Sequence, residues 1–317
     1  MVQKIVRARS LLAVLAIVVV SASAALPLLR ATASNCPAGG AIITSSLTLN
    51  SNCSYSGTNG IVLGANHITL NCNGHSITLT TPGNYKGISN EEGTGTTSDT
   101  VENCKVSGGW YYGMYFEFMS SLTLTGNTIT GPGIDEGVYL QYVGPATISG
   151  NKVSAYDEGF YCDEYCSSLT ITGNTATGTS SDNEGFYFDD SCNLLISGNT
   201  ATGFSYTYKG YPESYGFWLD DSGMYEDIVC SAGSLRGNTA TGNSYAGFYM
   251  DDAAGFTLSG NTANSNGKYG FYDDSYGSGP FGVGNTYSGN TCKLNGVYGS
   301  YDGEANEGPA FLCTPQG

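Results

Sequence analysis

Apolar and polar residues alternate in short segments that recur along the chain. Leu122 and Leu124 alternate with Thr123 and Thr125, and the same order returns in residues 169–172. A period of two predicts β-strands, because successive side chains of a strand point to opposite faces. The 3.6-residue apolar period of an amphipathic helix does not occur, so the pattern predicts an all-β fold.

These segments belong to a repeat of roughly two dozen residues. Each repeat has a strand such as SLTLT or SLTIT, a Gly-Asn dipeptide, and a second strand such as GVYLQ or GFYFD. We expect a turn at each Gly-Asn, with the Asn in the left-handed region and its side chain bonded to the next Asn in a ladder. The Asn residues of this series are Asn103, Asn127, Asn151, Asn174, Asn199, Asn238, Asn261 and Asn290.

Two or three short strands in about 24 residues fit one coil of a solenoid, in which each coil buries its apolar side chains against the next. A propeller is excluded, because one blade needs about 40 residues and four strands. From residue 36 on, the chain has room for about eleven or twelve coils of about 24 residues each. We therefore expect a single parallel β-helix domain over 34–317.

The segment ITLNCNGHSITL, at residues 68–79, resembles early coils of the pectin-lyase-like superfamily, especially its NosD-like group. The later LTITGNTATG units resemble the same repeats, so the resemblance covers most of the chain after residue 33. It implies a right-handed parallel β-helix. It implies no single function, because the superfamily includes lyases, hydrolases, epimerases, adhesins and proteins without an assigned activity.

Residues 1–33 have the features of a signal peptide. Lys4, Arg7 and Arg9 precede an apolar run over 11–29, and a small-residue cleavage pattern ends at Ala33. An uncleaved membrane anchor is the alternative, since the run is nearly long enough to span a bilayer. We expect cleavage, no membrane span in the rest of the chain, and a secreted or cell-surface protein.

The chain is strongly acidic. It has 27 Asp and Glu residues against 11 Lys and Arg, and the signal segment holds four of the basic residues and none of the acidic ones. The seven remaining basic residues leave the mature chain with a formal net charge of −20. Such a charge excludes nucleic acid as a partner and disfavours a polyanionic substrate unless cations mediate the contact.

All ten Cys lie after the signal segment, and an even number in an exported chain predicts disulfides that staple the coils. The position of the Cys within the repeats favours three pairs: Cys36–Cys53 at the first coil, Cys72–Cys104 on neighbouring coils, and Cys292–Cys313 at the last coil. The remaining four, Cys162, Cys166, Cys192 and Cys230, allow several pairings.

Each second strand begins with a Gly by which the strands can be aligned, and two columns of side chains then point outward together. The column two residues after the Gly is aromatic: Tyr115, Tyr139, Tyr161, Tyr187, Trp218, Tyr249, Tyr272 and Tyr298. The column four residues after it is mostly acidic: Glu117, Gln141, Asp163, Asp189, Asp220, Asp251, Asp274 and Ser300. A third, shorter column follows: Glu164, Asp190, Asp221 and Asp252.

The acidic columns have two interpretations. Carboxylates on neighbouring rungs, about 4.8 Å apart, repel by about 3.5 kcal/mol at an effective dielectric constant of 20, and hard cations such as Ca²⁺ would relieve this. Alternatively, Asp is simply a turn residue at each strand end. If cations bind, the candidate ligands are Asp163, Asp189, Asp190, Asp220, Asp221, Asp251, Asp252 and Asp274.

The aromatic column also has several interpretations. Aromatic ladders stabilise neighbouring strands, and they also form platforms on which sugar rings stack while acids bind the sugar hydroxyls. Contact between copies of the chain is a third interpretation. If the partner is a polysaccharide or a surface glycan, the candidate binding residues are Tyr161, Tyr187, Trp218, Tyr249 and Tyr272.

One coil is irregular, because Asn199 and Asn238 are 39 residues apart. The extra residues lie in 203–215 and 222–232, on both sides of the strand with Trp218. Insertions in solenoids often border the binding face, although a tolerated surface loop is the alternative. We expect four inserted residues to wall a groove over Tyr187, Trp218 and Tyr249: Tyr206, Tyr208, Lys209 and Tyr211.

We favour a binding protein over an enzyme. Pectate lyases with this fold use Ca²⁺ and a basic residue, and related hydrolases use Asp clusters with a nearby His. Here His67 and His75 are remote in sequence from the Asp pairs, and Arg236 is the one Arg after the signal segment. If the protein is a polysaccharide lyase or glycoside hydrolase, the catalytic candidates are Asp189, Asp220, Asp221 and Asp251.

Three functions therefore stay open. The first is a secreted or surface protein that binds glycans, divalent cations or both. The second is a lyase or hydrolase centred on the Asp pairs near Trp218. The third is a structural or adhesive protein that associates with its own copies.

Overall fold

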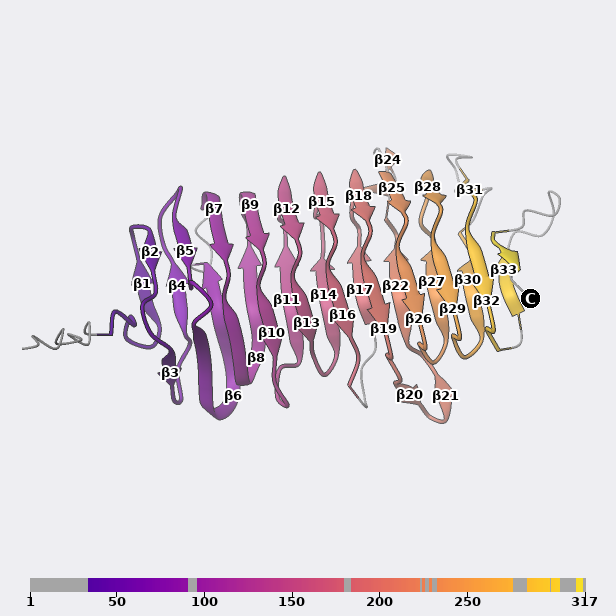
Figure 1. Cartoon of the computed structure of the whole chain (residues 1–317). Coiled ribbons are helices and arrows are strands. Elements are labelled where there is room, and N and C mark those ends of the chain that lie inside the picture. The colour runs from indigo at the N-terminus through magenta and orange to yellow at the C-terminus, as the bar shows by residue number, and fades with distance from the viewer. Residues whose placement is uncertain are drawn as a thin grey trace, which may run out of the picture. The chain divides into compact units, whose positions relative to one another are not determined.

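The chain winds into successive coils in which each strand pairs in parallel with its counterpart in the next coil (Figure 1). The computed structural model describes residues 34–90, 96–179, 184–222, 224–225, 228–229, 233–275, 284–296, 298–302 and 312–315. The signal peptide expected at 1–33 lies outside this part. The described residues form strands and turns without an α-helix, which confirms the all-β prediction, and none forms an apolar helix long enough for a membrane span.

The strands form three series that run along the stack. The first series is β1 (Ala41–Ile43), β4 (Ile61–Leu63), β6 (Ser76–Asn90), β8 (Lys105–Glu117), β11 (Glu136–Gln141), β14 (Glu158–Asp163), β17 (Glu184–Asp189), β22 (Tyr215–Asp220), β27 (Ala246–Asp251), β30 (Tyr269–Asp273) and β33 (Tyr298–Asp302). The second is β3 (Cys53–Tyr55), then β6 and β8 again, then β10 (Thr128–Thr130), β13 (Lys152–Ser154), β16 (Thr175–Thr177), β19 (Thr200–Thr202), β26 (Thr239–Thr241), β29 (Thr262–Asn264), β32 (Thr291–Lys293) and β34 (Thr314–Pro315). The third is β2 (Leu47–Thr48), β5 (Thr69–Asn71), β7 (Thr97–Glu102), β9 (Ser120–Thr125), β12 (Ala146–Ser149), β15 (Leu169–Thr172), β18 (Leu194–Ser197), β25 (Gly233–Arg236), β28 (Phe256–Ser259) and β31 (Thr286–Ser288).

The first two series each have eleven members, which confirms the expected number of about eleven coils. The long strands β6 and β8 belong to both series and join them into one 20-stranded sheet, whereas the third series is a separate 10-stranded sheet. Two small antiparallel hairpins stand outside the series, β20 (Thr207–Tyr208) with β21 (Tyr211–Pro212) and β23 (Met224–Tyr225) with β24 (Ile228–Val229). Both come from the irregular coil.

Side chains of one kind stack along the core. Five Phe side chains of the first series lie face to face, with ring centroids 4.7–4.8 Å apart and interplanar angles of 1–7°. All are almost fully buried, and each contact adds about 0.5–1.5 kcal/mol to the energy of burial. The ladder consists of Phe160, Phe186, Phe217, Phe248 and Phe271.

The Gly-Asn turns build the predicted Asn ladder. The side-chain oxygen of Asn199 accepts from both the backbone N–H (2.8 Å) and the amide group (3.0 Å) of Asn174, and this arrangement repeats from Asn127 to Asn290. One detail of the prediction is wrong. From Gly126 to Gly289 the left-handed residue of these turns is the Gly, with φ of 60–63°, and the Asn that follows it directs its side chain inward. Asn103 is left-handed, with φ of 55°, but it stands at the position of the Gly, because the next residue, Cys104, is the one that donates to Asn127.

The repeat Gly, the second residue of the first-series strands from β11 to β30, is needed for a different reason. A Cβ placed on Gly185 would lie 2.6 Å from the carbonyl oxygen of Gly216 and 2.7 Å from the Cβ of Ala201. The coils approach too closely at this corner for any side chain, so the repeat keeps Gly here, and the facing residue of the second series is Val153 opposite Gly137 and Ala in the later coils.

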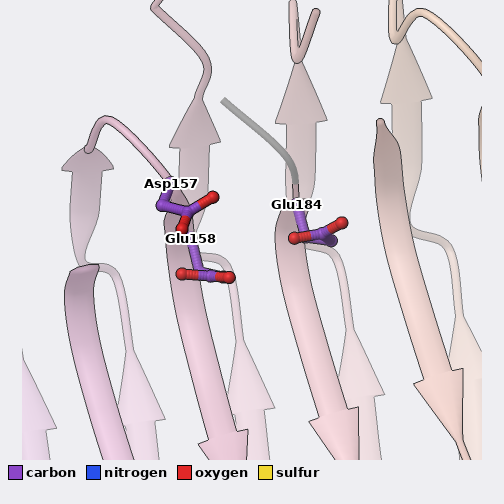
Figure 2. Close-up of side chains that lie close together, drawn as sticks. All are labelled: Asp157, Glu158 and Glu184. Carbon is purple, nitrogen blue, oxygen red and sulfur yellow. The ribbon is translucent and has the colours of Figure 1, made fainter. Parts of the chain in front are cut away.

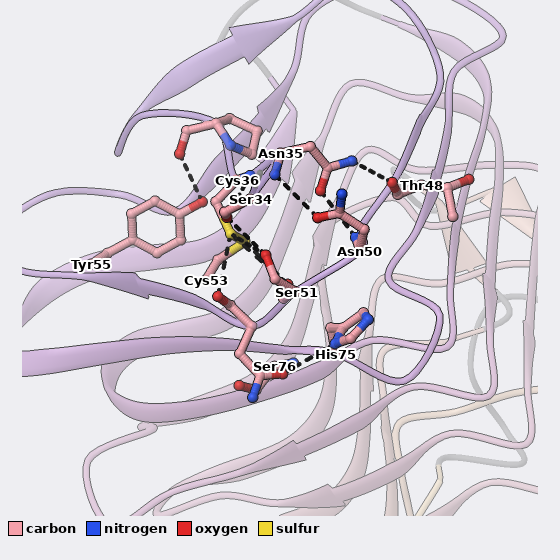
Figure 3. Close-up of a disulfide and its surroundings, with 12 residues drawn as sticks. Ser34, Asn35, Cys36, Thr48, Asn50, Ser51, Cys53, Tyr55, His75 and Ser76 are labelled. Carbon is pink, nitrogen blue, oxygen red and sulfur yellow. Dashed lines mark hydrogen bonds between the residues drawn. A yellow bond between two sulfur atoms is a disulfide. The ribbon is translucent and has the colours of Figure 1, made fainter. Parts of the chain in front are cut away.

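The disulfides confirm all three predicted pairs, Cys36–Cys53, Cys72–Cys104 and Cys292–Cys313. The structure adds Cys162–Cys166, one of the pairings that the sequence left open. Cys192 is also disulfide-bonded, and Cys230 lies outside the described residues. Figure 3 shows that the first disulfide lies beside a reciprocal pair, in which the backbone N–H groups of Asn35 and Asn50 each donate to the other's side-chain oxygen.

We predict that Asn174→Ala lowers the free energy of unfolding by about 2–4 kcal/mol, because two buried donors of Asn151 then lose their acceptor. Urea unfolding measures this loss. Asn264→Ala, a half-buried change on β29 outside the ladder, should cost less than about 0.5 kcal/mol. Equal losses in both variants would contradict a stabilising role for the ladder.

Candidate functional site

An aromatic row follows the first series of strands, at the positions expected from the sequence. Tyr139 pairs with Tyr161, Tyr161 with Tyr187, and Tyr187 with Trp218, each one coil apart. The aromatic row is Tyr115, Tyr139, Tyr161, Tyr187, Trp218, Tyr249 and Tyr272. The alignment of Tyr298 with this row is wrong, because β33 pairs Tyr301 with Tyr272, a shift of three residues.

The rings of the row stack on one another along the axis of the coils. Tyr161 and Tyr187 lie 4.8 Å apart at an angle of 6°, and Tyr187 and Trp218 lie 4.5 Å apart at 19°. Ring faces therefore cover each other from Tyr161 to Trp218, whereas Tyr139 meets Tyr161 edge to face at 83°. The row is not a flat platform of exposed faces for sugar rings.

A distal acid row, Asp163, Asp189, Asp220, Asp251 and Asp274, lies beside the aromatic row at the strand ends. The hydroxyl of Tyr187 donates to Asp220 at 3.1 Å, and that of Tyr249 donates to Asp274 at 3.1 Å. Each donor lies one coil before its acceptor, so these bonds connect neighbouring coils.

Burial and neighbouring carboxylates raise the pKa of several residues in this row. The pKa of Asp220 rises to about 7, first through burial and then through the charges of Asp251 and Asp189. The pKa values of Asp189 and Asp274 rise to about 6, again mainly through burial. Like charges on adjacent rungs thus favour protonation here near neutral pH.

The third column consists of turn residues. Glu164, Asp190, Asp221 and Asp252 all have positive φ, from 44° to 52°. The backbone N–H groups of Asp190 and Asp221 donate to the carbonyl oxygens of Asp220 and Asp251 on the next coil. These acids therefore have a structural reason to occur at each turn, since Asp tolerates this conformation.

The structure reveals a second acidic group that the sequence alignment missed, the proximal acid cluster of Glu136, Asp157, Glu158 and Glu184. It lies at the beginning of the strands, immediately before the repeat Gly. Figure 2 shows Asp157 and Glu158 at the start of β14 and Glu184 at the start of the adjacent β17. Carboxylate oxygens of these three lie within 4.8 Å of one another, and no other such group of three occurs in the described residues. The cluster could hold a metal ion.

Burial is the main cause of strongly raised pKa values in this cluster. It raises the pKa of Glu136 to about 8 and that of Glu158 to about 9, and neighbouring acids raise both further. The pKa of Glu184 is also raised, by burial and by the charges of Glu158 and Asp157. A signal for the cluster exists in the sequence, since Glu precedes the repeat Gly at 136, 158 and 184.

The aromatic row lies between the two acidic groups. Burial and the charges of both Asp163 and Glu158 raise the pKa of Tyr161, so this side chain is within electrostatic reach of both sides. Tyr215, which the alignment also missed, stacks against Tyr249 with centroids 5.0 Å apart and lies 4.9 Å from Trp218. The face thus combines stacked aromatic rings, phenol hydroxyls and two acidic groups.

The inserted hairpins lie at opposite ends of β22, with β20 and β21 before it and β23 and β24 after it (Figure 1). Tyr206 is half-buried, whereas Lys209 is exposed and 72% of the Tyr211 surface is accessible. The side chain of Tyr208 lies outside the described residues. The groove expected over Trp218 stays a prediction.

A family model described as a right-handed β-helix region matches residues 71–226 and 181–292. The chain belongs to the right-handed β-helix family. Among solved structures, this β-helix protein is similar to the periplasmic alginate epimerase AlgG, with 12% identity, a TM-score of 0.54, and coverage of 82% of this chain and 74% of the epimerase. It is also similar to the catalytic unit of an α-1,3-glucanase from Streptomyces thermodiastaticus strain HF3-3, with 12% identity, a TM-score of 0.46, and coverage of 88% and 62%.

The family match and the likeness to the epimerase confirm the fold expected from the pectin-lyase-like resemblance. Comparison with curated proteins gave no match. The disulfides of the β-helix protein are typical of proteins outside the cytosol.

We predict that Asp220→Asn stabilises the β-helix protein at pH 8 by about 1–2 kcal/mol, after allowing for solvent screening at this half-exposed site. The pKa of Asp220 rises from 3.8 to about 7 on folding, so the folded state binds more protons and stability falls as the pH rises between these values. Asn carries no charge, so the gain should vanish at pH 4. Thermal melts at both pH values measure this, and an equal gain at pH 4 would contradict it.

Proposed function

We propose that this protein is a secreted or cell-surface β-helix protein that binds a polysaccharide along the aromatic row and its flanking carboxylates. The observation that carries the proposal is the continuity of this face. From Tyr161 to Tyr272 the row keeps its register over five coils, a length of roughly 19 Å at the spacing of paired strands. Such a length suits an extended polymer better than a small molecule.

The chemistry of the face supports contact through polar edges. Phenol hydroxyls donate hydrogen bonds and carboxylates accept them, which matches the hydroxyl groups of sugars. Apolar contact is available at the cluster of Tyr215, Trp218 and Tyr249, where ring planes differ by 24–46° and the stacking is less regular. We infer that this cluster anchors the glycan and that the regular rungs on either side position it.

Charge restricts the class of polysaccharide. The net charge of −20 after signal removal repels polyanions, so the favoured ligand is neutral or basic, or an anionic polymer bridged by cations. The alginate epimerase, which shares the fold, acts on a polysaccharide, and this agrees with the proposed class of ligand. Cleavage of residues 1–33 would release the disulfide-bonded coils outside the cytosol.

Polysaccharide binding is tested by titrating residues 34–317 with a neutral glucan, a chitosan, and an alginate with and without Ca²⁺. Trp110 is fully buried, so a change in Trp fluorescence reports on Trp218. We expect saturable binding to at least one polymer, and an affinity about tenfold lower for Trp218→Ala, equivalent to about 1.4 kcal/mol.

Leu195→Ala is the matched control, because Leu195 is exposed on β18 in the other sheet. Calorimetry measures the affinity of both variants without relying on fluorescence. Absence of binding to every polymer, or equal affinities of the Trp218 variant and the parent protein, would refute the proposed face.

A second function, glycoside hydrolysis, is favoured by the pair Asp189 and Asp220. These residues face each other on adjacent coils, and the half-buried Asp220, with its pKa near 7, is suited to donate a proton. A separation of about one rung is close to the 5–5.5 Å between the carboxyl groups of retaining glycosidases.

Release of reducing ends from the same polymers tests hydrolysis. If it occurs at this pair, Asp220→Asn should lower the rate by about 10²–10⁴-fold, whereas Asp252→Asn, at a turn of the third column, should leave it nearly unchanged. Equal losses in both variants, or no product from any polymer, would exclude this pair as a catalytic centre.

A further inference from the structure

The proximal acid cluster differs from the repeating acids in that it brings carboxylates into one place. Asp157, Glu158 and Glu184 place oxygens within 4.8 Å of one another across two adjacent coils. Glu184 is 4% exposed, so its carboxyl group is well removed from water. Removing several carboxyl groups from water at one point is unfavourable unless protons or cations neutralise them.

Glu136 provides an independent indication of a ligand. Only 8% of the surface of Glu136 is exposed, and its Oε2 atom has no hydrogen-bond partner among the described residues. Val138 pairs with Phe160, so the register places Glu136 beside Glu158. The charge of Asp157 raises the pKa of Glu136, and the charge of Glu136 raises the pKa of Glu158. An unsatisfied, buried oxygen therefore lies on the coil next to these three acids, beside Glu158.

The charged groups that act on Glu136 and Glu184 are all acidic. For Glu136 they are Asp135, Asp157 and Asp163, and for Glu184 they are Glu158, Asp157 and Glu213. No Lys or Arg of the described chain contributes to either set. The charges that raise the pKa values of these two buried carboxyl groups are therefore negative, which favours their neutralisation by protons or by a cation from solution.

The ligand set determines which cation fits. All donor atoms are carboxylate oxygens, which favour hard cations over Zn²⁺ or Cu²⁺. Two oxygens that share one Ca²⁺ ion lie up to about 4.6–5.2 Å apart, whereas those sharing Mg²⁺ lie within about 4.2 Å. The oxygens of the cluster lie within 4.8 Å of one another, a spacing that Ca²⁺ can span and that Mg²⁺ accepts only at its shorter end.

We propose that the proximal acid cluster binds one Ca²⁺ ion between the coils of β14 and β17. Asp157, Glu158 and Glu184 are the ligands, and Glu136, with its unpartnered oxygen, lies beside Glu158 on the preceding coil. The ion neutralises acids on two adjacent coils and so connects the coils beside the aromatic row. This site is separate from the distal acid row and does not depend on polysaccharide binding.

Terbium(III) luminescence tests the site with residues 34–317 after treatment with a chelator. Tb³⁺ replaces Ca²⁺ at oxygen sites and emits when nearby aromatic rings are excited, and Tyr161 and Tyr215 are within electrostatic reach of Glu158 and Glu184. We expect saturable Tb³⁺ emission that Ca²⁺ displaces at lower concentration than Mg²⁺. The Kd for Ca²⁺ should be on the order of 10⁻⁴–10⁻³ M, as in extracellular modules.

Matched variants distinguish the two acidic groups. Glu184→Gln should abolish the emission or weaken Tb³⁺ binding at least tenfold, whereas Asp220→Asn, in the distal row, should leave it unchanged. Emission that survives Glu184→Gln, or that is lost in Asp220→Asn, overturns the assignment. Lack of saturable emission, together with no heat of Ca²⁺ binding in calorimetry, overturns the site itself.

A stability measurement keeps the test valid if one variant folds poorly. Ca²⁺ at about 10 mM, roughly 10–100 times the expected Kd, should raise the melting temperature of the parent protein by several degrees. The same addition should not change the melting temperature of Glu184→Gln or of Asp157→Asn, which alters the ligand at the start of β14. An equal rise in parent and variants would overturn the proposal.

Discussion

Every feature of this protein depends on the stacking of each coil on the next at the spacing of paired β-strands, about 4.8 Å. The nearest neighbour of a side chain is the residue at the same position one coil away. In a regular repeat, residues of the same type therefore stack on one another. Phe186 and Phe217 gain from this arrangement because flat rings stack, and Asn174 and Asn199 gain because an amide is both donor and acceptor. A repeat built from such residues becomes more stable with each coil that is added.

Carboxylates are the residues that this arrangement penalises most, and yet the first series carries two groups of them. In the distal row, Tyr187 donates to Asp220 and the pKa of Asp220 rises, so hydrogen bonds and protons reduce the repulsion. In the proximal cluster, Glu136 keeps a buried oxygen without a partner. Proteins retain buried polar atoms without a hydrogen-bond partner mainly at sites where function requires them. The distal acids thus have a structural explanation within the fold, whereas the proximal acids do not.

The sequence was sufficient to predict what the repeat determines. The strands, the coil number and the Asn ladder follow from periodicity, because every coil has the same sequence pattern. Three disulfides agree with the pairs that the positions of their Cys residues suggested. The errors arose in details of the pattern. The left-handed residue is the Gly and not the Asn that follows it, and β33 is shifted so that Tyr301 replaces Tyr298. The pairing of Cys162 with Cys166, which the sequence left open, stays within one coil.

The candidate site was harder to predict because it depends on side-chain orientation. Alternation showed that Tyr161 and Tyr187 point outward, but it could not show that their rings cover one another. The proximal cluster was missed for another reason. Its column repeats Glu only at 136, 158 and 184 and then changes to Tyr215 and Ala246, and the alignment considered only positions after the repeat Gly. A cluster confined to three coils gives only a weak periodic signal in the sequence. In the structure the same cluster is easily recognised, because its carboxylates lie close together.

The irregular coil shows how a ligand would lie on this face. The two hairpins adjoin opposite ends of β22, while Trp218 stands within the strand and stays in register with Tyr187 and Tyr249. The insertions therefore border the aromatic row without interrupting it. A ligand that runs along the axis of the β-helix meets hydroxyls and carboxylates on every coil. A ligand that runs parallel to the strands would contact the aromatic row on one coil only. An internal segment of a long polymer satisfies this geometry, and a short sugar would use only a small part of it.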